Sequence, residues 1–275
     1  MENRKILNLA HLEKSDIKYK KTTFPDGEPH IQLLDFDTKH IINIETRICN
    51  PNDLYTLLLV CDILDRWGVA YDINVSYLMS ARMDRLMDIM RPVSFNVVKN
   101  VVKTTHPKMF HVFDLHTGTS ASTKAFRECI GRAYKTRLEN NSVYVFPDMS
   151  ASTRYPLLLD SITSEFVVVC EKRRVNDTVT TVISEEDIVK IKESGSVMIV
   201  DDIIDGGRTI SNVIDIIKEN APKTSIYIYA SHCVNKEGLI KILNKCDVLY
   251  TSNSYADWDK ELPEYKSKLK VFEII

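Results

Sequence analysis

The sequence predicts an α/β protein built from two tandem units, each with a mainly parallel sheet flanked by helices. Short apolar runs, which are typical of buried parallel strands, alternate with longer segments whose apolar residues recur at helical spacing. This alternation occurs twice, and a polar, helix-like segment, 121–141, separates the two series. We therefore predict one domain over residues 1–134 and a second over residues 135–275.

In the first series, Asn52 and Asp53 predict a helix N-cap, and a helix is expected from Leu54 to about Trp67. A second helix is expected over residues 94–105. The letters F-P-D-G-E at 24–28 predict a tight turn, because they combine proline and glycine. The strand candidates of this series are residues 5–10, 31–33, 41–44, 73–79 and 109–113.

In the second series, the strand 197–200 is followed by a helix that Thr209 opens, with apolar residues at Ile210, Val213, Ile214 and Ile217. Another helix is expected around residues 156–162. The remaining strand candidates are residues 143–146, 166–170, 179–183, 226–230, 248–251 and 269–275.

The composition is that of an ordinary globular protein, with 44% hydrophobic and 27% charged residues. A formal net charge of −2 gives no electrostatic basis for binding nucleic acid. No apolar run approaches the ~18–20 residues of a membrane span, and no signal-peptide core follows the charged start, so we expect a cytoplasmic protein without a membrane partner. The six cysteines are scattered without zinc-site spacing, which favours reduced thiols.

The stretch 196–209 is the most informative part of the chain. An apolar strand stops at Asp201 and Asp202, and a loop with Gly206 and Gly207 leads into a helix. Unpaired backbone N–H groups and the helix dipole converge at such a turn, which favours binding of a phosphate. Carboxylates repel phosphate and suit sugar hydroxyls, so the pattern predicts a site for a phosphorylated sugar. An ordinary strand-to-helix turn with an acidic cap is the alternative interpretation.

Polar residues also follow two strands of the first series. The charged stretch 80–92 comes directly after one strand, and His116 follows the next. Both stand where parallel strands end, which is the edge at which open α/β sheets bind ligands. The alternatives are a solvated loop for the charged stretch and a structural histidine for His116.

Eight segments, in the same order along the chain, match one known pattern. They are F-P-D-G-E (24–28), P-N-D-L (51–54), R-M-D-R-L-M-D-I-M-R-P-V-S (82–94), F-D-L-H (113–116), F-P-D (146–148), E-K-R-R-x-N (171–176), V-D-D-I-I-D-G-G-R-T (200–209) and Y-A-S-H-C-V (229–234). Together they resemble the family of ribose-phosphate diphosphokinases (PRPP synthetases). The resemblance implies two tandem type I phosphoribosyltransferase-like domains, with ATP on the side of residues 1–134 and ribose 5-phosphate on the side of residues 135–275.

The resemblance implies transfer of the diphosphoryl group of Mg·ATP to the C1 hydroxyl of ribose 5-phosphate, giving PRPP and AMP. It also implies an ATP site shared between subunits, hence a homodimer or a hexamer. The implied catalytic residues are Lys172, Arg174, Arg82 and His116. The implied ATP-binding residues are Phe24, Asp26, Glu28, Arg82, Asp84 and His116. The implied ribose 5-phosphate residues are Asp201, Asp202, Asp205, Gly206, Gly207, Arg208 and Thr209. The implied ligands of the Mg²⁺ ion are His116 and Asp148.

The chain departs from the family pattern at several positions. Met83, Met87 and Arg208 stand where the family usually has glutamine, an acidic residue and a small residue. The groups nearest the transfer are nevertheless present, which favours a divergent, minimal enzyme. Two alternatives remain open: a type I phosphoribosyltransferase that consumes PRPP, and a non-catalytic regulatory subunit that resembles PRPP synthetase.

Overall fold

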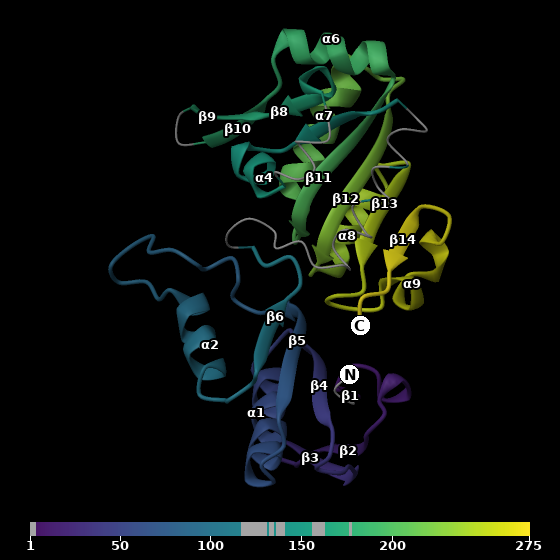
Figure 1. The fold of residues 1–275 in the computed structure, drawn as a ribbon. Helices are drawn as coiled ribbons and strands as arrows, with labels where there is room; N and C mark the ends of the chain where they lie inside the picture. The colour runs from purple at the N-terminus through teal and green to yellow at the C-terminus, as the bar shows by residue number, and fades with distance from the viewer. Residues whose placement is uncertain (1–3, 117–130, 132–134, 136–140, 156–162, 176–177) are drawn as a thin grey trace. The chain divides into compact units, whose positions relative to one another are not determined.

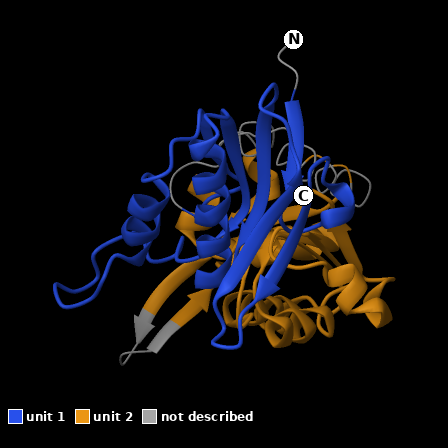
Figure 2. Cartoon of the chain, turned by 90° about the horizontal axis from the view of Figure 1, so that it is seen from below, with its two compact units in different colours: residues 1–117, 275 blue, residues 118–274 orange. Residues whose placement is uncertain are grey.

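The structure is a computed structural model, and it describes residues 4–116, 131, 135, 141–155, 163–175 and 178–275. The chain divides into two compact units (Figure 2), residues 1–117 with residue 275 and residues 118–274. The boundary predicted at 134/135 and most of the segment 121–141 lie outside the described residues, so that boundary stays a prediction. Each unit is described by itself below.

The described part of the first unit contains a four-stranded parallel sheet of order β1-β4-β5-β6 (Figure 1). Strand β4 alternates half-buried and buried residues, which is the pattern of a strand with one face toward the core. The parallel pairing places all four carboxyl ends at one edge of the sheet. The strands are β1 (Arg4–Asn8), β4 (Ile41–Ile48), β5 (Tyr71–Leu78) and β6 (Met109–Val112).

Strands β2 (Lys18–Thr23) and β3 (Pro29–Asp35) form an antiparallel hairpin, and F-P-D-G-E makes the predicted turn between them, with Gly27 at a φ of 92°. Helix α1 (Pro51–Arg66) begins one residue before the predicted cap. Its N-cap is Asn50, whose side chain accepts hydrogen bonds from the backbone N–H groups of residues 52 and 53. The prediction of a cap at 52–53 was wrong because Pro51 is suited to the first helical position. The other described helices of this unit are η1 (Leu12–Lys14) and α2 (Ser94–Val102).

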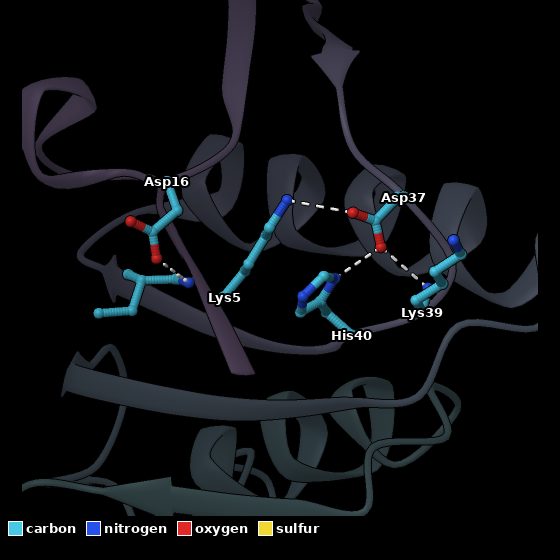
Figure 3. A network of polar contacts seen from close by, with 6 residues as sticks. Lys5, Asp16, Asp37, Lys39 and His40 are labelled. Carbon is cyan, nitrogen blue, oxygen red and sulfur yellow. Dashed lines mark hydrogen bonds and ion pairs between the residues drawn. The ribbon is translucent and has the colours of Figure 1, made fainter. Parts of the chain in front are cut away.

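A network of polar contacts lies at the amino end of this sheet (Figure 3). Asp37 contacts Lys5 of β1 at 3.2 Å and the Nδ1 atom of His40 at 2.6 Å, just before β4 begins. The hydrogen bonds from His40 and from the backbone N–H of Lys39 hold the pKa of Asp37 far below its usual value. The network lies at the end opposite to the carboxyl ends of the strands, which is not the edge at which open α/β sheets bind ligands.

The described part of the second unit contains six strands in parallel, in the order β14-β13-β12-β11-β7-β8. Central strand β11 is buried along most of its length, as predicted for its apolar run. The strands are β7 (Val143–Phe146), β8 (Val167–Val169), β11 (Ser196–Ile204), β12 (Ser225–Cys233), β13 (Val248–Ser252) and β14 (Leu269–Phe272).

The main core of this unit forms where α6, α7 and α8 pack on the sheet. Ile191, Val213, Ile217 and Leu239 each have no exposed surface there. A separate antiparallel hairpin joins β9 (Glu171–Val175) to β10 (Thr178–Val182). The helices described in this unit are α4 (Met149–Arg154), η2 (Ser164–Phe166), α6 (Glu185–Ser194), α7 (Arg208–Asn220), α8 (Lys236–Leu243), α9 (Trp258–Glu261) and η3 (Pro263–Tyr265).

The helix expected around 156–162 lies outside the described residues. Within the described part of the chain, no helix is both long enough and apolar enough to span a membrane.

Candidate active site

Strand β11 is longer than the sequence predicts and includes the two aspartates of the motif. The strand was expected to stop before Asp201, but it continues to Ile204. The reason is its pairing with β12, in which Asp201 lies beside Ala230 and Ile204 beside Cys233. Asp201 and Asp202 are therefore held in the sheet by β12 on one side, while the pairing of β11 with β7 on the other side ends at Ile199.

A short loop connects β11 to α7 through Asp205, Gly206 and Gly207. Gly207 is the N-cap of α7 and has left-handed backbone angles, with φ 67° and ψ 11°. The helix starts at Arg208, one residue earlier than predicted, and its cap contributes no side chain. The first N–H groups of α7 therefore point out of the helix end without a side-chain cap, as an anion site requires.

Helix α8 supports this loop from the side through Gly238, which the sequence analysis missed. A Cβ atom on Gly238 would lie 1.6 Å from the carbonyl oxygen of Asp205, so no larger residue fits in this arrangement. The available signal was a glycine inside an apolar helical segment of a chain that has only 8 glycines. The loop between β11 and α7 is thus shaped by close backbone packing as well as by its own two glycines.

The two carboxylates at the end of β11 have different surroundings. Asp202 is 2% exposed, and its Oδ2 atom lies 3.3 Å from the Nη1 atom of Arg154 in α4. Asp201 is half-buried, and its Oδ1 atom accepts a hydrogen bond of 2.9 Å from the backbone N–H of Asp202. Burial, the charge of Asp202 and a hydrogen bond with its side chain raise the pKa of Asp201 well above its usual value. Arg154 was also missed, because sequence spacing does not reveal which arginine is buried.

Asp148, predicted as a metal ligand, is the N-cap of α4. Its Oδ1 atom accepts a hydrogen bond of 2.9 Å from the backbone N–H of Ala151, and its Oδ2 atom is ion-paired with Lys172. Burial would raise the pKa of Asp148, but the hydrogen bonds from Lys172 and Ala151 lower it below its usual value. Asp148 is therefore an ionised oxygen donor, which is the kind of ligand that Mg²⁺ prefers.

Lys172 lies on strand β9. Residues 171–175 pair with β10, with Lys172 beside Thr181. The basic segment is thus one arm of a hairpin, because strand-forming residues follow it at 178–182. The side chain of Arg174, and residues 176–177 between the two arms, lie outside the described part.

In the first unit, Arg82, Asp84 and His116 follow the carboxyl ends of β5 and β6. These are neighbouring strands. Arg82 is exposed, and Asp84 and His116 are half-buried. Each strand is followed within two residues by a non-glycine residue in left-handed conformation, Ser80 with φ 67° and Asp114 with φ 37°. Such conformations cost energy and cluster at functional sites, so this edge has the character of a ligand site.

The other predicted ATP residues lie at the tip of the β2–β3 hairpin. Phe24, Asp26 and Glu28 are all exposed, and Phe24 is 48% exposed with its ring 5.5 Å from that of His30. The carboxylate of Glu28 accepts a hydrogen bond of 3.0 Å from the hydroxyl of Tyr55 in α1. The structure thus divides the predicted ATP residues between an exposed turn and the sheet edge.

No group of three or more histidine, cysteine or acidic side chains lies close enough to hold a metal ion by itself, among the residues that the structure describes. Mg²⁺ is commonly bound by one or two carboxylates together with substrate phosphates, so it needs no such group. The ionised, partly exposed carboxylate of Asp148 fits that mode of binding.

The fold and the glycine loop after β11 define a phosphoribosyltransferase-type protein. A family model described as the phosphoribosyl transferase domain matches residues 119–268, and the chain belongs to this family.

Curated relatives match over most of the chain. A ribose-phosphate pyrophosphokinase of Mycoplasmopsis pulmonis is 26% identical over 271 residues, covering 92% of this chain and 81% of the relative. The enzyme of that name from Pyrococcus abyssi is 26% identical over 269 residues, covering 94% of this chain and 89% of the relative.

A solved structure agrees with this assignment. Phosphoribosylpyrophosphate synthetase from Mycobacterium smegmatis has a TM-score of 0.79 at 18% identity, covering 99% of this chain and 95% of that one. At that identity the likeness concerns the fold. These findings confirm the predicted α/β fold, the resemblance to the ribose-phosphate diphosphokinases and the prediction of an enzyme.

Proposed function

We propose that the chain is a ribose-phosphate diphosphokinase, which transfers the diphosphoryl group of Mg·ATP to the C1 hydroxyl of ribose 5-phosphate. The single observation that carries the proposal is the β11–α7 connection, where two carboxylates precede an uncapped helix start shaped by Gly207. Relatives named ribose-phosphate pyrophosphokinase over most of the chain support it. A phosphorylated sugar matches both halves of this connection, the anion site and the hydroxyl acceptors.

In the proposed complex, the 5-phosphate accepts hydrogen bonds from the backbone of the loop and from the hydroxyl of Thr209. The carboxylates before the loop face the sugar. Arg208 is exposed at the first position of α7, where its guanidinium can add positive charge beside the phosphate. Arg208→Gly should therefore raise the KM for ribose 5-phosphate with little change in kcat, and an unchanged KM would exclude this role for Arg208.

The reaction forms a bond between the C1 oxygen and the β-phosphorus of ATP. The bond between that phosphorus and the α,β-bridging oxygen breaks, AMP leaves with that oxygen, and the hydroxyl proton passes to solvent water. Phosphoryl transfer depends on in-line positioning and on positive charge around the transferring group. Lys172 and Arg174 on β9 supply that charge, the first as a point charge and the second as a planar fork.

The Mg²⁺ ion would be held by Asp148 and His116 and would neutralise charge on the ATP phosphates. Lys172 has to leave Asp148 before it can face those phosphates. The pair is partly exposed, with 43% of the lysine side chain and 24% of the aspartate side chain accessible. Exposed ion pairs contribute only about 0–1 kcal/mol, so this exchange is cheap.

ATP is assigned to the first unit. Arg82 and His116 at the sheet edge contact its phosphates. Asp84, two residues after Arg82, belongs to the same proposed ATP site. The exposed turn residues Phe24, Asp26 and Glu28 contact the adenine of ATP bound to a neighbouring subunit, which makes the chain at least a homodimer, with a hexamer as the larger form. Arg82→Ala should raise the KM for ATP and leave the dissociation constant of ribose 5-phosphate unchanged.

The decisive experiment incubates the purified chain with Mg·ATP and ribose 5-phosphate and follows AMP and PRPP. Equal amounts of both products support the proposal. Consumption of added PRPP with a nucleobase would instead identify a phosphoribosyltransferase, and the absence of both reactions at micromolar enzyme would identify a non-catalytic subunit. Lys172→Ala should lower kcat far more than it weakens substrate binding, whereas Lys190→Ala, on the exterior helix α6, is the matched control.

A further inference from the structure

The loop between β5 and α2 concentrates exposed apolar side chains. Figure 1 shows residues 80–92 as a long loop that leaves the end of β5 and returns at α2. A single exposed apolar side chain is ordinary on a protein surface, whereas a run of them marks a place where the surface has a particular chemistry. The run here includes three methionines. Its members, between 45% and 88% exposed, are Met83, Leu86, Met87, Ile89 and Met90.

Backbone hydrogen bonds hold two of these methionines in their exposed positions. The N–H of Met83 donates to the carbonyl oxygen of Ser80 at 2.9 Å, and the carbonyl oxygen of Met83 accepts from the N–H of Phe95 at 3.1 Å. The N–H of Met90 donates to the Oδ1 atom of Asp88 at 2.9 Å. The thioethers are therefore presented to solvent by the folded conformation of the loop.

An exposed thioether reacts with peroxides. A sulfur lone pair attacks one oxygen of hydrogen peroxide, the S–O bond forms, the O–O bond breaks, and the second oxygen leaves as water. The sulfur is oxidised by two electrons to a sulfoxide, which is polar and accepts hydrogen bonds. In this loop the change removes no core packing. Met198 of β11 differs, because it has no exposed surface and cannot react in the folded protein.

Met83 also stands at the proposed ATP site, between Arg82 and Asp84. Guanidinium groups only donate hydrogen bonds, and a phosphate and a sulfoxide oxygen are both acceptors for them. The same loop contains Arg85 and Arg91, which are exposed. A sulfoxide at Met83 therefore introduces an acceptor that competes with the ATP phosphates for the donors of this loop.

We propose that the loop 80–92 is a peroxide-sensitive modification site, in which oxidation of Met83 to the sulfoxide weakens the binding of ATP. The proposal rests on the function proposed above, which assigns ATP to this edge of the sheet. The modification is reversible, because methionine sulfoxide reductases return the sulfoxide to the thioether. It gives a role to one position at which the chain departs from the family pattern, since the glutamine usual there has no sulfur to oxidise.

The test treats the purified chain with hydrogen peroxide and measures three properties. Peptide mapping by mass spectrometry should find the loop methionines oxidised while Met198 remains intact. The Tm should change by no more than about 2 °C, because the modified side chains are on the surface. The Kd for Mg·ATP, measured by calorimetry, should rise about three- to ten-fold and should recover after treatment with the reductases.

Leucine variants identify the methionine responsible. Met83→Leu keeps the apolar volume without the sulfur, so it should bind ATP like the wild type and keep that affinity after peroxide treatment. Met87→Leu is the matched control from the same loop, and it should lose affinity as the wild type does. An equal loss in Met83→Leu would overturn the proposal, because the effect would then come from another exposed methionine such as Met149.

Two further outcomes would also overturn it. One is a peptide map in which the loop methionines resist peroxide in the folded chain, and the other is an oxidised loop with an unchanged Kd for ATP. A wild type that binds ATP without forming AMP and PRPP refutes the proposed function and leaves the ATP-binding test intact. A wild type that binds no ATP refutes the ATP assignment and this proposal together.

Discussion

Gly207 provides a sharp test of what determines the conformation of the loop between β11 and α7. Its φ of 67° lies in the left-handed region, and a Cβ atom there would meet the carbonyl oxygen of Gly238 and the Cγ1 atom of Ile242, each at 3.0 Å. Left-handed geometry costs an L-residue about 1–2 kcal/mol, and overpacking a dense site costs about 1–3 kcal/mol. Replacing glycine by alanine also lowers the conformational entropy of the unfolded chain, which stabilises the folded protein by about 0.4–1 kcal/mol.

Gly207→Ala should therefore lower the free energy of unfolding by about 1–5 kcal/mol, measured by urea titration. Gly206→Ala is the matched control, because that glycine is not left-handed and its Cβ would meet nothing within 4 Å. It should change the free energy of unfolding by no more than about 0.5 kcal/mol. Gly207→Asn tolerates the left-handed backbone but keeps the crowding, so it should recover only the conformational part.

Equal losses in Gly206→Ala and Gly207→Ala would refute this account of the loop, since neither the backbone angle nor the contact with α8 would then matter. If Gly207→Asn restores the full free energy of unfolding that Gly207→Ala loses, the contribution of crowding against α8 is refuted, while the contribution of the left-handed backbone stands. The KM for ribose 5-phosphate should rise in Gly207→Ala, because the N–H groups at the start of α7 would move with the loop.

Three further predictions follow from single contacts. Asn50→Ala should lower the free energy of unfolding by about 1 kcal/mol in urea titration, because the side chain of Asn50 caps α1; an unchanged value would mean that water replaces the cap. The pKa of Asp148 is lower in the folded protein, so the stabilisation from Lys172 is complete above the usual carboxyl pKa of about 4 and is lost as the pH falls through the lowered value. The difference in urea midpoint between wild type and Asp148→Asn should accordingly shrink between about pH 6 and pH 3, and a constant difference would contradict the pairing. Burial raises the pKa of Cys61 and Cys233 to about 12, so both thiols should react with a disulfide reagent at pH 8 only after unfolding, as followed by absorbance and peptide mapping.

The sequence predicted the parallel sheets well because buried strands and amphipathic helices are local patterns. Strand β11 is the instructive exception, since its last four residues are strand only through their pairing with β12. The same limit explains the cap of α1, where Pro51 shifts the helix start back to Asn50. A strand's end and a helix's first residue depend on neighbours that one-dimensional spacing does not contain.

The candidate site was predicted less completely than the fold. Motifs identify candidate site residues that are close together in the sequence. Arg154 and Gly238 contact the β11–α7 connection from other helices, and these contacts are set by the packing of the folded chain. The basic segment 171–175 forms a strand because β10 returns beside it. The ion pair between Lys172 and Asp148 was not predicted, because Lys172 was expected to contact the substrate and Asp148 to bind a metal ion.

The three carboxylates around this connection are compensated in three different ways, and the differences indicate which of them a ligand can use. Asp202 is paired inside the protein, where breaking the pair costs about 3–5 kcal/mol. Asp148 is paired with an accessible lysine at about 0–1 kcal/mol, whereas Asp201 has a raised pKa and accepts a hydrogen bond from the backbone N–H of Asp202. Under the proposed function, a phosphorylated sugar and a metal ion would recruit Asp201 and Asp148 at small cost, and recruiting Asp148 would release Lys172 from its ion pair. The same exchange would then prepare both the metal ligand and the charge that phosphoryl transfer requires.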